Sequence, residues 1–378
     1  MMKVCFIGDV YLNPKHNRGS FAFSKDVKEL FSECDNVCIN LEAPILNEKN
    51  ATPLDKKGPN LYQDYSRLAS FTELQNVSFC LANNHIMDYG EKGLDSTISF
   101  LGAERCLGAG VDCYKELIVS DKNGGHKIAI LAVAENGFGC EDAENGHGYA
   151  WFNSPKFWNK LDELKGKYDS LVVISHAGLE DTNLPLPEIR EQYKRYIDHG
   201  ADVVIAHHPH VIQGKEVYKD KDIYYSLGNA VFEQLDTGLP YNPESIAVEV
   251  EVDDARTISR VIPLKYEDGV LKKDESALIL YDKACELLED ERKYQAEADK
   301  VCLDFYAKIY RNYYASIFGR QNKLKNLIMS VIYLFGKDIF DESMLFHNLF
   351  IETHYWCVKR ALKLKRRKFT TNGNSEVI

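Results

Sequence analysis

The stretch SLVVISHAGLEDTNLPLPEIREQYKRYIDHGADVVIAHHPH, residues 170–210, decides the fold that we expect. Two short runs rich in valine and isoleucine, at 170–175 and 202–206, flank an amphipathic segment at 187–200 that begins with proline and ends with glycine. Proline at the start and glycine at the end are the usual boundaries of a helix. Continuous apolar runs are typical of strands that are covered on both faces. The stretch therefore predicts a strand–helix–strand unit.

The same alternation of apolar runs and amphipathic segments continues through the first 230 residues. Apolar runs predict strands at 3–8, 37–41, 77–82, 127–133, 170–175, 202–206 and 222–227, and amphipathic segments predict helices at 24–34, 91–101 and 187–200. Alternating strands and helices predict a layered α/β domain. Two later runs, at 245–253 and 260–266, alternate apolar and polar residues, which predicts half-exposed antiparallel strands that close the domain.

The pattern changes after the last of these strands. From about residue 276 the apolar residues recur with helical periodicity, and no run has the character of a strand. We therefore expect a layered domain over 1–270, an α-helical region over 276–369 and a flexible end over 370–378. A chain of 378 residues with 45% hydrophobic and 27% charged residues is long enough to form one large domain with such an appendage.

The formal net charge of −11 is unevenly distributed. Residues 301–378 contain 13 Lys and Arg against 6 Asp and Glu, a net +7, which leaves 33 and 51, a net −18, for the rest of the chain. The segment VKRALKLKRRK, 358–368, is the most basic part. It has two interpretations: a solvated helix end whose lysines interact with the helix dipole, or a contact with a membrane surface or another polyanion, with Trp356, Leu362 and Leu364 as interfacial anchors. The acidic body and the lack of a recognition motif argue against a nucleic-acid partner.

Cysteine usage and hydropathy bear on the cellular compartment. The ten cysteines form no CxxC pair, and Cys5, Cys38 and Cys80 stand inside apolar runs, where a thiol behaves as a small hydrophobic group. This pattern is typical of a reducing compartment. The N-terminal residues lack the apolar core of a signal peptide, and LIMSVIYLF at 327–335 is about half of the roughly 20 residues that a spanning helix needs. We expect a cytoplasmic protein that could also attach to a membrane surface.

Polar side chains with metal-binding or hydrogen-bonding capacity follow the predicted strands. They are Asp9, Asn40, Glu42, Asn83, Asn84, His85, Asp88, His176, His207, His208, His210 and Asn229. Because the carboxyl ends of the strands of an open α/β sheet meet at one edge, we expect these side chains to converge there. Each one alone has an ordinary structural explanation as a cap, a turn residue or a satisfied histidine. Together, their carboxylate, amide and imidazole groups predict a metal centre.

The chemistry of these groups indicates which metals would suit the centre. Oxygen and imidazole ligands without cysteine favour one or two divalent ions of Mn, Fe or Zn. A carboxylate such as Glu42 can bridge two ions about 3.5–4 Å apart, an arrangement that clamps an in-line displacement at phosphorus. Metal-assisted chemistry on a phosphoester is therefore one function that the residues themselves suggest.

The ordered set of motifs resembles the CapA family of capsule synthesis, also called the poly-γ-glutamate biosynthesis type, within the calcineurin-like metallophosphatase superfamily. The matching motifs are GDV at 8–10, NLEAP at 40–44, ANNHIMDYG at 82–90, SHAG at 175–178, HHPHVIQG at 207–214 and SLGN at 226–229. The resemblance covers roughly residues 1–250 and implies an α/β/β/α sandwich. The helical C-terminal region lies outside it.

The resemblance also implies a role for each strand-end residue. Asp9 and His210 would bind a first metal, Glu42 would bridge, and Asn84, His176 and His208 would bind a second metal. His85 would give a proton or hydrogen bond to the leaving group, with Asp88 orienting its ring. Asn40, Asn83, His207 and Asn229 are expected at the substrate, with packing of its turn as the default role of Asn83.

Two positions depart from the pattern of the phosphatases. Their first strand carries Asp-x-His, whereas here Tyr11 stands where the histidine would be. Glu42 replaces the aspartate that bridges the metals in their GDxxD motif. Both departures are typical of the CapA branch, and the first one leaves the first metal short of one ligand.

Three functions follow from this comparison and stay open at the level of sequence. The first is a metal-dependent phosphoesterase of capsule or exopolymer synthesis, which hydrolyses a phosphorylated sugar, lipid-linked intermediate or polymer by metal-activated water. The second is a non-catalytic, metal-containing component that binds or assembles an anionic polymer, which the missing histidine favours. The third is a hydrolase or ligase of γ-glutamyl bonds, for which the sequence offers neither a nucleophile elbow nor a P-loop.

Overall fold

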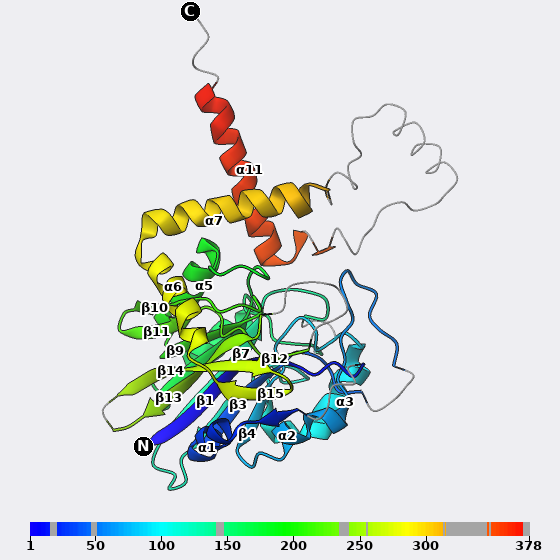
Figure 1. Ribbon diagram of the computed structural model, residues 1–378, viewed down its shortest axis with the longest axis vertical. Helices are drawn as coiled ribbons and strands as arrows, with labels where there is room; N and C mark the ends of the chain where they lie inside the picture. Colours follow the sequence, from blue (N-terminus) through cyan, green and yellow to red (C-terminus); the bar gives the residue numbers. More distant parts are fainter. Residues whose placement is uncertain are drawn as a thin grey trace, which may run out of the picture. The chain divides into compact units, whose positions relative to one another are not determined.

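A computed structural model gives the structure of the chain (Figure 1). It describes residues 1–15, 21–46, 51–140, 147–233, 242–254, 256–312, 314, 346–347 and 349–372. The chain divides into two compact units, one formed by 1–54 with 59–291 and the other by 55–58 with 292–378. The predicted metal-binding residues all belong to the first unit.

The first unit contains a nine-stranded sheet built around β1 (Met2–Tyr11). On one side of β1 run the parallel strands β3 (Asn36–Leu41), β4 (Val77–Cys80) and β5 (Cys106–Leu107). On the other side run the antiparallel strands β13 (Glu244–Val252), β14 (Thr257–Glu267) and β15 (Val270–Lys273), followed by β2 (Ala22–Phe23). The short strand β12 (Asn229–Phe232) pairs in parallel with the end of β1.

A second sheet of six strands carries the remaining predicted strands of the first unit. Its order is β10 (Lys215–Tyr218), β11 (Lys221–Tyr224), β9 (Val203–His207), β8 (Ser170–His176), β7 (Lys127–Ala134) and β6 (Leu117–Ser120). The strands from β11 to β7 are parallel to one another. One buried apolar core contains residues of both sheets, among them Ile7, Val248, Ile130 and Ile174.

Helices complete the layers. The helices of the first unit are α1 (Lys25–Glu33), α2 (Ala69–Thr72), α3 (Gly90–Leu101), α4 (Pro155–Leu164), α5 (Pro187–Asp198) and α6 (Ser276–Glu289). α1 packs against β15 of the nine-stranded sheet, whereas α4 and α5 pack against β7 and β9 of the six-stranded sheet. The strand–helix–strand unit predicted at 170–210 is β8–α5–β9, and the predicted layered α/β fold is confirmed.

The prediction of a half-exposed strand at 245–253 is wrong. β13 lies inside the sheet, between β1 and β14, and is buried along almost its whole length. Glu249 and Glu251 are only 5% and 4% exposed. Lys3 compensates both charges, with its Nζ 3.7 Å from Glu249 and 3.0 Å from Glu251, and Arg260 also pairs with Glu251. Cations on the two flanking strands thus allow an alternating sequence to occupy a buried strand.

The second unit is helical where the structure describes it. α7 (Glu291–Phe305) continues into one π-helical turn (Tyr306–Tyr310), and α11 spans Glu352–Asn372. Cys302 of α7 and Cys357 of α11 are buried at their contact, and Arg360 donates to Asp299 at 2.9 Å. α6 belongs to the first unit, and the predicted division at 270–276 stays a prediction.

Two expectations about membranes and the chain end depend on segments that the structure only partly describes. The apolar segment 327–335 and residues 373–378 lie outside the described residues. Among the helices that are described, none is both long enough and apolar enough to cross a bilayer.

Candidate metal centre

The end of β1 brings Asp9 to the carboxyl edge of the sheet. The register of β1 shifts at Asp9 against both β3 and β12, as in a β-bulge, which re-aims a side chain. The backbone N–H of Asp9 donates to the carbonyl of Gly228 at 3.0 Å. A Cβ at Gly8 would lie 2.0 Å from that carbonyl oxygen. Only glycine at position 8 therefore allows β1 to approach the SLGN turn closely enough to place Asp9.

The loop after β9 holds its histidines in an unusual backbone conformation. His208 and His210 have φ angles of 97° and 58°, a region that side-chain-bearing residues rarely adopt. Hydrogen bonds fix the loop, from the N–H of Ala177 to the carbonyl of His207 and from that of Asp181 to the carbonyl of Pro209. Such conformations persist where the surroundings determine them, and they are common at functional sites.

Four of the predicted ligands meet at the ring of His176. Its Nε2 lies 2.9 Å from Asn84 Oδ1, 3.1 Å from His208 Nδ1 and 3.6 Å from Glu42 Oε1. Ligand atoms bound at about 2.0–2.2 Å from one ion lie roughly 3–3.5 Å apart. The spacing of these four atoms is therefore close to that of a metal-binding set.

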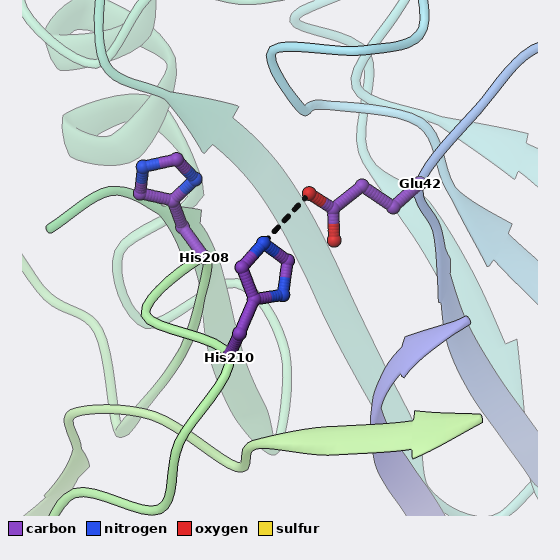
Figure 2. A group of neighbouring side chains, drawn as sticks. All are labelled: Glu42, His208 and His210. Carbon is purple, nitrogen blue, oxygen red and sulfur yellow. Dashed lines mark ion pairs between the residues drawn. The ribbon is translucent and has the colours of Figure 1, made fainter. Parts of the chain in front are cut away.

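The remaining predicted ligands are grouped around His210. His210 Nε2 is 3.5 Å from Glu42 Oε1, and His210 Nδ1 is 3.5 Å from Asp9 Oδ2. Figure 2 shows the His210 ring and the Glu42 carboxylate pointing toward one another. The candidate ligand atoms form two groups, and within each group all the atoms lie within 4.8 Å of one another. One group consists of Asp9, Glu42 and His176, and the other of Glu42, His208 and His210. Glu42 belongs to both.

Glu42 itself is the best indication that the centre fits divalent ions. Its side chain is completely buried, and neither carboxylate oxygen has a hydrogen-bond partner among the described residues. A buried carboxylate without hydrogen-bond partners is costly unless a cation compensates it. The oxygen and imidazole donors around it are those that Mn, Fe and Zn prefer. The site is therefore compatible with divalent metal ions.

The protonation states of the histidines also suit this role. Burial lowers the pKa of His176 well below its usual value and that of His208 to about 4, so both rings are neutral at neutral pH. Burial would also lower the pKa of His210, but the charges of Glu42 and Asp9 raise it well above the usual value. A protonated His210 thus places positive charge between the two carboxylates in the absence of a metal.

The two carboxylates respond differently to their surroundings. Burial would raise the pKa of Asp9, but hydrogen bonds and charge from His207 and His210 hold it well below its usual value. Burial raises the pKa of Glu42 well above its usual value, against the opposing charge of His210. Asp9 is therefore anionic in the metal-free protein, whereas Glu42 is the group that gains most from a bound cation.

The four residues that were expected at the substrate, Asn40, Asn83, His207 and Asn229, are all buried. Asn40 Nδ2 lies 2.6 Å from Asp9 Oδ1 and 3.2 Å from His176 Nδ1, and His207 Nδ1 lies 3.2 Å from Asp9 Oδ1. Asn229 Oδ1 lies 2.9 Å from His210 Nδ1. These side chains therefore orient the candidate ligands, and their contact with a substrate stays a prediction.

Asn83 serves the turn that carries Asn84 and His85. Its Nδ2 donates to the carbonyl of Leu41 at 2.9 Å, and its Oδ1 accepts from the N–H of His85 at 3.2 Å. His85 Nδ1 lies 2.7 Å from Asp88 Oδ2, an oxygen that also accepts from the N–H of Leu61 at 2.6 Å. The structure thus brings His85 and Asp88 together, and their catalytic roles stay a prediction.

Tyr11 does not take the place of the histidine that the phosphatases carry. Its ring is buried against Phe232, with the ring centroids 5.2 Å apart, and Phe232 in turn contacts the ring of His210 at 4.7 Å. The phenol therefore belongs to an aromatic wall that supports His210.

One acidic residue near the centre was missed in the sequence. Glu135 follows β7 and is 5% exposed, and its Oε1 lies 3.8 Å from His208 Nε2. It comes directly after an apolar run, as the other site residues do, so the same rule could have found it.

Comparison with known proteins places the chain in a family. Residues 3–234 match the family described as bacterial capsule synthesis protein PGA_cap. The chain belongs to this family. The resemblance predicted from the motifs is thus confirmed, and all the candidate ligands lie in the PGA_cap region.

Two capsule proteins illustrate the relationship within PGA_cap. The chain is 31% identical over 247 residues to the PGA biosynthesis protein CapA of Bacillus subtilis (strain 168). This match covers 62% of the chain and 64% of the Bacillus subtilis protein. It is 33% identical over 266 residues to the capsule biosynthesis protein CapA of Bacillus anthracis, covering 67% and 64%. The matches therefore span less than two thirds of either relative. The chain also matches the solved structure of a hypothetical protein from Thermus thermophilus, with 17% identity and a TM-score of 0.44. This match covers 70% of the chain and 99% of the Thermus protein.

Proposed function

We propose that this PGA_cap protein is a metal-dependent phosphoesterase that acts in the synthesis of a capsule or related anionic exopolymer. The observation that carries the proposal is the buried carboxylate of Glu42, which has no hydrogen-bond partner among the described residues and is shared by two groups of candidate ligands. The names of the Bacillus relatives support the pathway. The substrate class that we propose is a phosphorylated sugar, a lipid-linked intermediate or a phosphate-bearing polymer.

Six residues would hold the metal. They are Asp9, Glu42, Asn84, His176, His208 and His210. A divalent ion in this place would supply a Lewis acid and would lower the pKa of a bound water toward ~7. The neutral rings of His176 and His208 offer lone pairs to such an ion without first losing a proton.

His85 is the proton donor in this proposal. Asp88 accepts a hydrogen bond from His85 Nδ1 at 2.7 Å, and this contact fixes the ring and stabilises its protonated form. The opposite nitrogen, Nε2, is then the atom from which a proton can pass to the departing alkoxide of the substrate. Asp88 acts through His85, so we regard it as a positioning residue.

A second function, binding of an anionic polymer without turnover, is favoured by the position of Tyr11. Its ring packs on Phe232, so the histidine that would complete the first metal site of a phosphatase has no substitute at this position. A centre that retains an ion but lacks this ligand would recognise phosphate or carboxylate groups without hydrolysing them.

Activity and metal content measured together distinguish the two functions. Hydrolysis of 4-nitrophenyl phosphate with added Mn²⁺ is expected for the wild type. It is expected to fall by about 10²–10⁴-fold in His85→Ala and to disappear in Asn84→Ala, which lacks a candidate metal ligand. His126→Ala is the matched control, because His126 also contacts a carboxylate, Asp121 at 3.1 Å, but is not among the candidate site residues. Stoichiometric metal without hydrolysis across a panel of phosphoesters would favour the binding function. Absence of bound metal would contradict both.

The basic helix α11 suggests a membrane partner, and we propose that it binds an anionic lipid surface. Tyr355, Lys359, Leu362, Lys363 and Arg366 are all exposed, and Tyr355, Lys359, Leu362 and Arg366 recur at helical spacing on one face. Basic and apolar side chains on one face of a helix are typical of interfacial binding. Trp356 and Leu364, also predicted as anchors, are half-buried.

Vesicle sedimentation tests this contact. Wild-type protein is expected to sediment with phosphatidylglycerol vesicles at low salt and to be released at high salt, and Lys359→Glu/Lys363→Glu is expected to stay in the supernatant. The control is Lys25→Glu/Lys122→Glu, which changes two exposed lysines of the first unit. Equal sedimentation of both double variants, or none by the wild type, would refute the proposal.

A further inference from the structure

Glu135 occupies a fixed position beside the metal centre. It follows β7 directly, and its backbone N–H donates to the carbonyl of His176 at 3.1 Å. The preceding residue, Ala134, pairs with His176 in the register of β7 and β8. β7 pairs along its length with β8, so the backbone of Glu135 is held next to the strand that carries His176.

Two contacts connect the carboxylate of Glu135 to the residues around the centre. Its Oε1 accepts a hydrogen bond from the N–H of Gly178 at 3.0 Å, and the same oxygen lies 3.8 Å from His208 Nε2. Gly178 has a φ of +142°, and a Cβ there would lie 3.0 Å from Pro209, within the histidine loop. Glu135 therefore connects the strand that carries His176 to the loop that carries His208.

The two nitrogens of His208 face different partners. Nδ1 lies 3.1 Å from His176 Nε2, on the side of the candidate ligands, whereas Nε2 faces Glu135. A neutral imidazole has one N–H and one lone pair, and the partner of one nitrogen decides which is which. A carboxylate beside Nε2 favours the proton on Nε2, and the lone pair then remains on Nδ1.

We propose that Glu135 is a positioning residue of the metal centre, which holds His208 as the Nε2–H tautomer and so directs its Nδ1 at the ion. This inference depends on the proposed metal centre for its function, but the tautomer itself exists without metal. Carboxylates that orient a metal-binding histidine typically contribute 10–100-fold to metal affinity. Glu135 is not a member of either group of candidate ligands in the described part of the chain.

The tautomer can be measured directly in metal-free protein by ¹⁵N-histidine NMR, with the His208 signals identified by their absence in His208→Asn. We expect an Nε2–H tautomer in the wild type and a mixture of tautomers in Glu135→Ala. Glu135→Gln, whose side-chain oxygen would keep a negative partial charge beside Nε2, is expected to keep the wild-type tautomer. An Nδ1–H tautomer in the wild type, or no change in Glu135→Ala, would overturn the proposal.

Mn²⁺ affinity provides the second measurement. We expect Kd to rise about 10–100-fold in Glu135→Ala and by less in Glu135→Gln. Glu249→Ala is the matched control, because Glu249 is equally buried but pairs with Lys3 on β1, and its Kd is expected to stay close to that of the wild type. If Glu135→Ala does not fold, the wild-type tautomer and Glu135→Gln still decide the matter. If the wild type has the Nε2–H tautomer but binds no Mn²⁺, the proposed metal centre is refuted and the orientation of His208 by Glu135 is not. Failure of the metal centre can therefore be distinguished from failure of the role of Glu135.

Discussion

Replacing Glu42 by glutamine should affect stability differently without and with a divalent metal. Glutamine keeps the shape of the side chain and removes the charge. In the metal-free protein the Glu42 carboxylate is buried without hydrogen-bond partners among the described residues, and burial raises its pKa. A carboxyl group whose pKa is higher in the folded than in the unfolded protein stabilises the fold at low pH, where it is protonated. This contribution to the free energy of unfolding is lost as the pH rises through the pKa of the folded protein. Near neutral pH, the variant therefore avoids a cost that the wild type carries.

The magnitudes follow from the two states. A buried polar group without hydrogen-bond partners costs about 1–3 kcal/mol, and more if it is charged. The glutamine amide is still a buried polar group, so the variant avoids only the additional cost of the charge, and it loses the contact of Glu42 with His210 at 3.5 Å. We therefore expect metal-free Glu42→Gln to be about as stable as the wild type or more stable by about 1 kcal/mol. At a metal concentration of about 100 Kd the wild type gains about 2.7 kcal/mol, or about 5–10 °C in Tm. The variant should lose most of this gain.

Thermal unfolding of both proteins with EDTA and with Mn²⁺ measures the two effects. Glu249→Gln serves as the control, because it removes a buried carboxylate that is paired with Lys3. It should lower the metal-free Tm and leave the shift produced by Mn²⁺ unchanged. If Glu42→Gln instead lowered the metal-free stability by more than about 1 kcal/mol and kept the full Mn²⁺ shift, Glu42 would be a structural residue and the reasoning would be refuted.

Three further predictions concern the same centre. His85→Ala should lower kcat for an aryl phosphate by about 10²–10⁴-fold without changing the metal content, because His85 is not a candidate ligand; equal loss of metal would argue against its assigned role. Gly8→Ala should lower the free energy of unfolding by about 3 kcal/mol or more, since its Cβ would lie 2.0 Å from the Gly228 oxygen. Denaturant titration measures this loss, with Gly125→Ala as the control because a Cβ there would be near Asp121 only. Mn²⁺ binding should release protons and become tighter as the pH rises, because Glu42 and Asp9 raise the pKa of His210 and the ion displaces the proton of its ring. Calorimetry in buffers of different ionisation enthalpy measures this release. The same binding enthalpy in every buffer would mean that His210 is already neutral.

The strands and the convergence of the candidate ligands could be predicted because local sequence determines both, whereas metal binding by these residues stays a prediction. The apolar runs of β7, β8 and β9 are recognisable without knowledge of their partner strands. His176 and His208 could be expected at the same edge of the sheet because both follow such runs, at the carboxyl ends of parallel strands. Gly8 illustrates the limit of that rule: the glycine is visible in the sequence, but its close approach to Gly228 depends on the turn before β12, which is remote from β1 along the chain.

Features that depend on neighbours in space could not be predicted in the same way. β13 looked half-exposed because its glutamates alternate with apolar residues, and nothing in the run itself shows that Lys3 and Arg260 lie on the flanking strands. Asn40 and Asn229 show the same limit. Their residue type indicates hydrogen-bonding capacity, but only the structure shows that these amides contact Asp9 and His210.

Metal analysis of the purified protein is the most direct test of the central claim, which is that Glu42 and its neighbours form a divalent metal centre. After incubation of the wild type with Mn²⁺, Fe²⁺ or Zn²⁺ and removal of the excess, elemental analysis should find one or two ions per chain. Glu42→Gln should retain less, and a crystal of the loaded wild type should show anomalous scattering between Glu42 and His176. Wild-type protein that retains no ion under any of these conditions would contradict the account.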